Sequence, residues 1–313
     1  MQPEQTAFRS PDSQPFLVTA STTLLPGSSG GVNSAALKNP TGGPMEILEI
    51  RWQLEGVLVA FSLGALVGCK LELGKIPLTN GFVPIWNFNR SDNTFDESPP
   101  PDGAVIFAEY CWRLPRPLYV PANSVVVPTF QHFGAVHFPV DVQVTYSCRT
   151  VLEKPKQVCL PYAASFVSKA MPVTEDSSDS SRETDIYNPF SEPLKLASFV
   201  GRVSVMATAP EPAALIVFES FLPFIGVSLD SGQMMNVRMR DMTGREIIRR
   251  GTLFRQAFPT ATRAWEMEMG ETLPPEAYFL AEIETTAFLP LLPEVTALRQ
   301  AFIGMTGWRE VSL

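Results

Sequence analysis

The sequence predicts an all-β protein built from two similar sandwich or barrel units. Three features lead to this prediction: a high proline content, many short segments typical of strands, and two collinear repeats. Of the 313 residues, 29 are proline, well above the usual ~5%. Because proline inside a helix costs about 3 kcal/mol, this composition favours short strands with proline-bounded loops over a helical bundle.

The length and hydrophobicity of the chain are sufficient for two cores. A chain of 313 residues corresponds to roughly two domains of about 100–200 residues each, and 45% of its residues are hydrophobic. The charged fraction of 18% lies below the usual ~25%. This composition argues against full-length disorder and suggests that partners cover some of the surface.

The charge balance is acidic, with 24 Lys and Arg against 32 Asp and Glu and a formal net charge of −8. A general nucleic-acid coat needs many basic residues to displace counterions. We therefore expect no direct sequence-specific binding of nucleic acid. Residues 1–14 lack the charged and apolar regions of a signal peptide. The apolar run 56–68 is too short for a spanning helix of ~20 residues, so we expect a soluble protein made in the cytoplasm, with membrane contact left open.

An internal repeat gives the strongest information on domain organisation. Segments 39–47 and 188–196 both fit the pattern N-P-x-x-x-P-[ML]-x-[IL], at an offset of 149 residues (39 to 188). Further along, a tryptophan precedes a proline by nine residues in each copy: Trp112 and Pro121, then Trp265 and Pro274, at an offset of 153 (112 to 265). Two collinear matches with similar offsets indicate a duplication.

Each copy contains several predicted strands. In the first copy they are 45–52, 71–73, 83–88, 105–112, 124–130 and 140–147; in the second they are 197–205, 215–219, 234–240, 246–249, 264–268 and 277–284. In segment 140–147, Val140, Val142, Val144 and Tyr146 fall on one face. This number of strands in each copy is typical of a sandwich or barrel.

Changes in composition suggest the domain boundaries. We expect an extended N-terminal arm over 1–38, a first unit over 39–155, a linker over 156–187, a second unit over 188–288 and a tail over 289–313. The linker contains the acidic and serine-rich run 175–185. The tail should contain a short helix with a spacing of apolar residues that suits one helical face: Val295, Leu298, Ala301, Phe302 and Met305.

This combination resembles the double jelly-roll major capsid proteins of tailless icosahedral viruses, the lineage that bacteriophages share with adenovirus hexon. The resemblance covers residues 39–290 and depends on Asn39-Pro40 and Asn188-Pro189 at the start of each copy and on the two Trp…Pro segments. It implies two tandem jelly-roll β-barrels with short helical or extended termini.

The resemblance also implies a function. A major capsid protein would build an icosahedral virion shell as homotrimers whose six barrels give a pseudo-hexameric outline. Its partners would be further copies of itself and minor capsid or vertex proteins, with an internal membrane surface left open. The protein would be assembled in the host cytoplasm and located in the virion.

No catalytic, cofactor or metal site is expected. The two histidines, His132 and His137, are separated by four residues, whereas metal-binding cupins, which are also jelly rolls, use an H-x-H pair. A catalytic triad needs a histidine to activate a serine or cysteine, and neither histidine has a nucleophile motif beside it. No pair of cysteines has the C-x2-C spacing of a zinc site, so free buried thiols are expected at all four positions: Cys69, Cys111, Cys148 and Cys159.

An arginine-rich segment, 236–256, is the candidate contact site. It contains six arginines and two acids, Asp241 and Glu246. The plain interpretation is a solvated hairpin face. The functional interpretation is a contact between subunits, because arginine is enriched at interfaces and the rest of the chain is acidic. The nominated contact residues are Arg238, Arg240, Arg249 and Arg250.

Two other functions remain open from the sequence. A receptor- or carbohydrate-binding β-sandwich, similar to a spike or lectin, would require an exposed aromatic face such as that of Trp86 or Trp112. Both tryptophans lie in apolar strand contexts, so we expect both in the core. A duplicated cupin enzyme is disfavoured by the scarcity of histidine.

Overall fold

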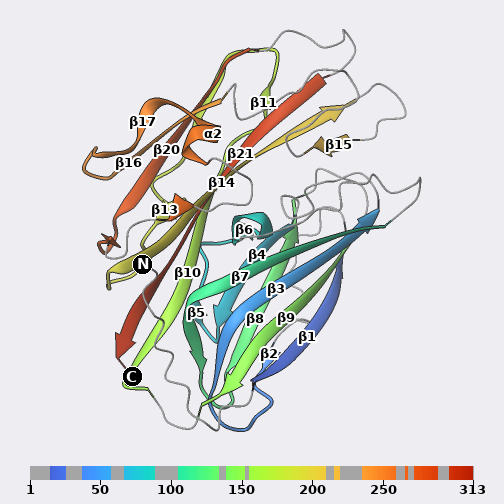
Figure 1. Cartoon of the computed structure of the whole chain (residues 1–313), viewed down its shortest axis with the longest axis vertical. Helices are drawn as coiled ribbons and strands as arrows, with labels where there is room; N and C mark the ends of the chain where they lie inside the picture. Colours follow the sequence, from blue (N-terminus) through green and yellow to red (C-terminus); the bar gives the residue numbers. More distant parts are fainter. Residues whose placement is uncertain are drawn as a thin grey trace.

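A computed structural model describes residues 15–25, 37–57, 67–88, 105–133, 139–151, 155–208, 215–218, 235–258, 265–266, 271–287 and 296–312. These residues form four antiparallel sheets arranged as two separate pairs (Figure 1). Each pair encloses one hydrophobic cluster of buried side chains. Two short helical turns also occur, η2 (Ile85–Phe88) and α2 (Phe254–Ala257).

The first pair of sheets uses the N-terminal half of the chain. One sheet has the strand order β1-β9-β3-β7, with bounds Pro15–Leu24, Val140–Thr150, Met45–Val57 and Val105–Val120. The facing sheet has the order β2-β8-β4-β5, with bounds Leu37–Lys38, Val125–His132, Val67–Leu73 and Ile76–Pro77. A further short strand, β6 (Val83–Pro84), also pairs with β4.

The second pair of sheets repeats this plan. One sheet has the order β10-β21-β14-β15, with bounds Gln157–Val167, Thr296–Ser312, Leu194–Thr208 and Leu215–Phe218. Three short strands lie beside this path: β11 (Met171–Pro172) on β21, and β18 (Trp265–Glu266) and β19 (Thr272–Leu273) on β14. The facing sheet has the order β12-β20-β16-β17, with bounds Ser177–Ser180, Tyr278–Thr285, Met235–Asp241 and Glu246–Leu253, and β13 (Ile186–Tyr187) pairs with β20.

These strand orders define a jelly roll in each half. Seven strands of each half alternate between its two facing sheets: β1, β2, β3, β4, β7, β8 and β9 in the first half, and β10, β12, β14, β16, β19, β20 and β21 in the second. The last strand of each half lies between the first strand and the third of these. That is the double Greek-key arrangement of a jelly roll. The prediction of two jelly rolls side by side is therefore confirmed, and the chain is a double jelly roll.

The repeat is present in the strand register as well as in the sequence. The β3–β7 ladder pairs Ile50 with Trp112, and the β14–β18 ladder pairs Phe199 with Trp265. The offsets are 149 (50 to 199) and 153 (112 to 265), the same two offsets that the sequence shows. Both strands also have a bulge at equivalent positions, which are Leu48 in β3 and Ala197 in β14. The predicted equivalence of the two tryptophans is confirmed.

The prediction of an N-terminal arm outside the barrels is wrong from Pro15 onward. Strand β1 pairs along its full length with β9, and Leu24 and Leu37 are 0% and 1% exposed. The segment has few large apolar residues because only one face of this edge strand is covered; Phe16 and Val18 pack against the core while Thr19 points outward. Low hydrophobicity was therefore a poor indication of an arm.

The predicted linker, 156–187, also belongs to the second jelly roll. It contains β10, which is its first strand, and the serine-rich part of the acidic run forms β12. Strand β12 is hydrogen-bonded to β20 and has an alternating, half-exposed pattern. Polar residues suit such a short outer strand, so composition alone did not distinguish it from a linker.

The predicted C-terminal helix is wrong, because residues 296–312 form the long strand β21. This strand lies between β10 and β14, and both of its faces are covered. Ile303 belongs to the core of the second roll, whereas Phe302 packs with the core of the first. Strands buried on both faces lose their alternation of polar and apolar residues, so the apolar run matched a helical spacing by coincidence.

The two rolls are joined by a buried contact. The turn η2 projects from the first roll onto β14 and β21 of the second. The ring of Trp86 lies 5.4 Å from that of Phe302, and the guanidinium of Arg202 lies 5.0 Å from the centre of the Trp86 ring. At Gly304 an added Cβ would lie 2.7 Å from the Cβ of Asn87. Close approach of the two rolls therefore requires glycine at this position.

Candidate subunit-contact site

The repeated Asn-Pro segments form a corner in each roll. The Asn39 side chain donates to the carbonyls of Gly43 at 2.6 Å and Pro121 at 3.5 Å, and its oxygen accepts from the Thr41 N–H at 3.0 Å. Asn188 makes the equivalent contacts with Glu192 at 2.8 Å, Pro274 at 3.0 Å and Phe190 at 3.1 Å. The two sequence landmarks of each copy, the asparagine and the late proline, thus contact each other. Their role is structural.

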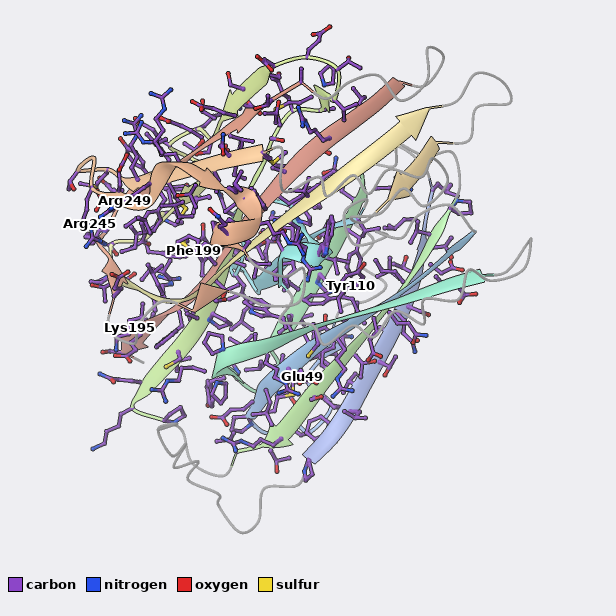
Figure 2. The ribbon with its side chains drawn as sticks, turned by 45° about the horizontal axis from the view of Figure 1, so that its top comes forward. Glu49, Tyr110, Lys195, Phe199, Arg245 and Arg249 are labelled. Carbon is purple, nitrogen blue, oxygen red and sulfur yellow. The ribbon has the colours of Figure 1, made fainter. Side chains whose placement is uncertain are left out.

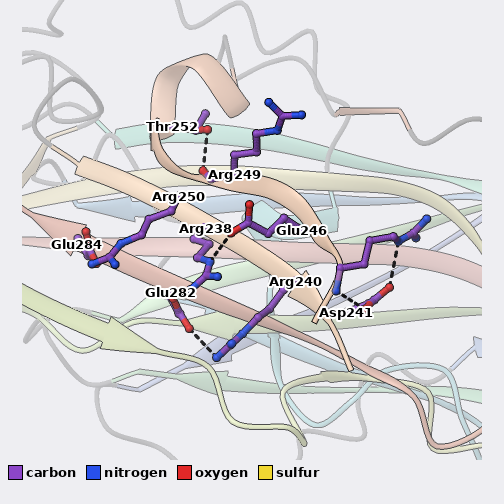
Figure 3. A network of polar contacts seen from close by, with 10 residues as sticks. Arg238, Arg240, Asp241, Glu246, Arg249, Arg250, Thr252, Glu282 and Glu284 are labelled. Carbon is purple, nitrogen blue, oxygen red and sulfur yellow. Dashed lines mark hydrogen bonds and ion pairs between the residues drawn. The ribbon is translucent and has the colours of Figure 1, made fainter. Parts of the chain in front are cut away.

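The nominated arginines lie on the β16–β17 hairpin of the second roll, with acids from β20 beside them (Figure 3). Arg238 donates to Glu246 at 2.8 Å and to Glu282 at 3.2 Å. Arg240 donates to the other oxygen of Glu282 at 2.8 Å. The hydrogen bonds to Glu246 and then Glu282 raise the pKa of Arg238. The β16 arginines are therefore part of an ion-pair network within the chain.

The β17 arginines are more exposed. Arg250 pairs with Glu284 at 3.1 Å while its side chain stays 71% exposed. Arg249 is exposed, and its side chain makes no ion pair with any residue in the described part of the chain. Arg245 is held by Asp241 at 3.1 Å. Burial acts to raise the pKa of Asp241, but hydrogen bonds from Thr243 and Arg245 lower it overall.

The structure therefore separates the four nominated residues into two groups. Arg238 and Arg240 are neutralised by Glu246 and Glu282, whereas Arg249 and Arg250 are exposed, with Arg250 beside Glu284 (Figure 3). The acids on β20, Glu282 and Glu284, are distant in sequence from these arginines, so the sequence does not indicate the pairing. Figure 2 shows Arg245 and Arg249 in the second roll, well away from Glu49 in the first.

The other candidate residues are mostly buried. Trp86 and Trp112 are 1% and 2% exposed, which confirms the prediction that they are core residues. His132 is buried, and His137 lies outside the described residues. Within the described part of the chain, no group of three or more His, Cys, Asp or Glu side chains is arranged to hold a metal ion.

The four cysteines are free thiols, as expected, and they are buried or half-buried. Burial raises the pKa of Cys148 to about 12, and burial followed by the nearby Glu49 raises that of Cys111 to about 12. Such thiols are poor nucleophiles because the reactive thiolate is scarce. Among the described residues, none of the helices has the length and apolar character needed to cross a membrane.

Comparison with known proteins finds similarity at the level of structure only. No family model and no curated protein matches the sequence. VP54 of PBCV-1, fitted into a reconstruction of the virophage Sputnik, is 12% identical with a TM-score of 0.49, covering 95% of this chain and 94% of that one. The structure from Sulfolobus Turreted Icosahedral Virus is 10% identical with a TM-score of 0.42, covering 93% and 90%. The major capsid protein P2 of bacteriophage PM2 is 8% identical with a TM-score of 0.31, covering 93% and 98%.

Proposed function

We propose that the chain is a major capsid protein that forms the shell of an icosahedral virion as pseudo-hexameric homotrimers. The observation that carries the proposal is the duplication itself: two jelly rolls with the same strand order and matching registers lie side by side in one chain. Three such chains present six similar barrels around one axis, so a trimer can occupy a position of sixfold shape. The family that the sequence resembles has the same role.

The buried junction between the rolls supports this proposal. Trp86, Phe302 and Arg202 hold the two barrels in one fixed arrangement. A building block for a closed shell needs such a fixed angle, because small errors at each contact add up over the lattice. The partners in this proposal are further copies of the chain, minor capsid or vertex proteins and, in particles that contain one, an internal membrane surface.

Electron microscopy of the purified chain tests the proposal. We expect particles with a three-fold axis and a hexagonal outline, and closed or sheet-like assemblies under conditions that promote association. A uniform population of single chains at micromolar concentration would contradict the proposed function. A receptor-binding sandwich would also remain small, and it would bind sugars on a glycan array.

A further inference from the structure

The two rolls contain an equivalent segment after their β4 and β16 strands. Gly81 and Gly251 both have positive φ, +65° and +80°, and are 170 residues apart. The residue three positions before each glycine is Leu78 in the first roll and Ile248 in the second. Both side chains are buried, and the backbone of each residue pairs with the preceding strand, at Leu71 of β4 and Met239 of β16. Thr79-Asn80 in the first roll therefore corresponds to Arg249-Arg250 in the second.

In the first roll this segment docks on the second roll. Thr79 forms a parallel bridge with Ala163 of β10. The Ala163 N–H donates to the Leu78 carbonyl at 3.0 Å, and the Asn80 N–H donates to the Ala163 carbonyl at 2.8 Å. The Asn80 side chain also donates to the carbonyls of Thr184 and Asp185. The outer edge of β10 is thus hydrogen-bonded within the chain at Ala163.

The helical turn that follows shows the same difference between the rolls. All four residues of η2 are buried, because the turn lies between the rolls. The equivalent turn α2 also starts directly after a paired strand residue, Leu253, but only Phe254 is buried, while Arg255 and Gln256 are exposed. The Arg249-Arg250 segment and α2 of the second roll therefore correspond to the docked segment and η2 of the first, but neither roll of the described chain covers them.

The strand that receives the docked segment, β10, also has an equivalent in the first roll, β1, and the described chain leaves the outer edge of β1 uncovered. Pro15-Phe16 on β1 and Pro161-Tyr162 on β10 are equivalent in register, 146 residues apart, so Leu17 corresponds to Ala163. Ala163 is 0% exposed, whereas Leu17 is 69% exposed. Strand β1 is the edge of its sheet, and no described segment pairs with its outer side. An uncharged, uncovered edge strand is a template for a further contact.

The two uncovered surfaces have opposite charge. Outward-facing acids lie on the sheet that begins with β1: Glu55, Glu109 and Asp141. Glu55 and Asp141 are direct cross-strand partners, an arrangement of like charges that is unfavourable without a cation nearby. Arg51 and Arg113 on the same face are paired with Glu49. Arg249 of the second roll, which is exposed and has no ion-pair partner in the described part of the chain, would supply positive charge, together with the exposed Arg250 beside Glu284.

We propose that the Arg249-Arg250 segment and α2 of one copy dock on β1 and its acidic sheet face in a second copy. This contact repeats between chains the contact that joins the two rolls within each chain. It deepens the proposed function, on which it rests, by assigning the subunit interface to these residues. A head-to-tail contact of this type uses two different surfaces and can close into a ring.

Cysteine cross-linking of the full chain tests the assignment. Thr79 and Ala163 are bridge partners, so Leu17→Cys and Arg249→Cys should lie within disulfide reach across the interface. The two positions lie on β1 and β17, which are far apart in one molecule (Figure 1), so any bond between them joins two copies. We expect the double variant L17C/R249C to oxidise to covalent dimers and trimers. The matched control is L17C/K75C, since Lys75 occupies the equivalent exposed hairpin in the first roll. This control should give no covalent dimers or trimers.

Charge reversal provides a second readout that does not depend on oxidation. R249E/R250E should weaken self-association at least tenfold, and adding E109R/D141R to the same chain should restore it. Trimers without 17–249 cross-links, or association unaffected by R249E/R250E, would overturn the assignment but leave the capsid proposal standing. A chain that stays monomeric at all concentrations would contradict both.

Discussion

Asn188 fixes a buried corner of the second roll at the scale of a single residue. It is 0% exposed, and its side-chain nitrogen donates to the carbonyls of Glu192, Leu273 and Pro274. Asn188→Ala would remove a donor from each of these carbonyls, of which that of Pro274 keeps the Ala277 N–H, so we expect the free energy of unfolding to fall by about 2–4 kcal/mol. Denaturant titration measures this. Asn39→Ala, at the less buried equivalent corner, should cost less; equal costs would contradict the role of burial.

Gly201 is required by the ring of Phe258. An added Cβ would lie 2.1 Å from that ring, so Gly201→Ala forces a shift in the core. We expect a destabilisation of about 1–3 kcal/mol, measured by thermal unfolding. Gly43→Ala is the matched control, because a Cβ there meets nothing within 4 Å. A melting temperature for Gly201→Ala equal to that of the control would refute this packing.

Glu49 makes stability depend on pH. Burial acts to raise its pKa, but the hydrogen bond from Arg51 and further contacts lower it overall below 4.5. The unfolded chain therefore binds more protons, so this contribution is present above about pH 4.5 and is lost as the pH falls through the lower folded pKa. We expect Glu49→Gln to flatten the stability–pH curve below pH 4.5, measured by denaturant titration, and a curve identical to that of the unchanged protein would contradict this role of Glu49.

Strand β1 is the element whose structure differs most from what the sequence predicts. Deleting residues 1–24 removes it, which uncovers β9 and takes Phe16 and Val18 away from the core. We expect this truncated chain to be insoluble or to melt well below the full chain. Deleting only residues 1–14 is the control, since it keeps β1. If both truncated chains melt at the same temperature, β1 does not stabilise the first roll.

Elements covered on one face were predictable, and elements covered on both were not. The alternation in β9 located its buried residues correctly. In β21, Ala301, Phe302 and Ile303 are all buried because a roll packs on each side of the strand. Such a run contains no periodicity that distinguishes a strand from a helix. The position of the strand depends on β10, which is distant in sequence.

The candidate site was predictable only in part for a similar reason. The arginine density of segment 236–256 indicated a charged surface. The ion pairs of Arg240 and Arg250 depend on Glu282 and Glu284, which come from β20 through sheet pairing. The correspondence of Arg249-Arg250 with Thr79-Asn80 required two structural facts, the positive φ of the glycines and the strand register.

At the scale of the whole molecule, the sequence reveals the duplication because the repeated residues have the same structural role in both rolls. Asn39 with Pro121 and Asn188 with Pro274 form the same corner, so both copies retain the same residue types. The surfaces of the two rolls differ instead. The docking surface of the first roll is apolar around Trp86, whereas that of the second carries Arg255. This difference fits one contact within the chain and another between chains.

Native mass spectrometry of the purified full chain tests the central claim most directly. A chain of 34.4 kDa that assembles as proposed should give a dominant species of about 103 kDa, three times that mass, with larger species at higher concentration. Head-to-tail closure of three copies requires this stoichiometry. A single species of 34.4 kDa at every concentration, or a dimer with no trimer, would contradict the assembly of this double jelly roll into a capsid.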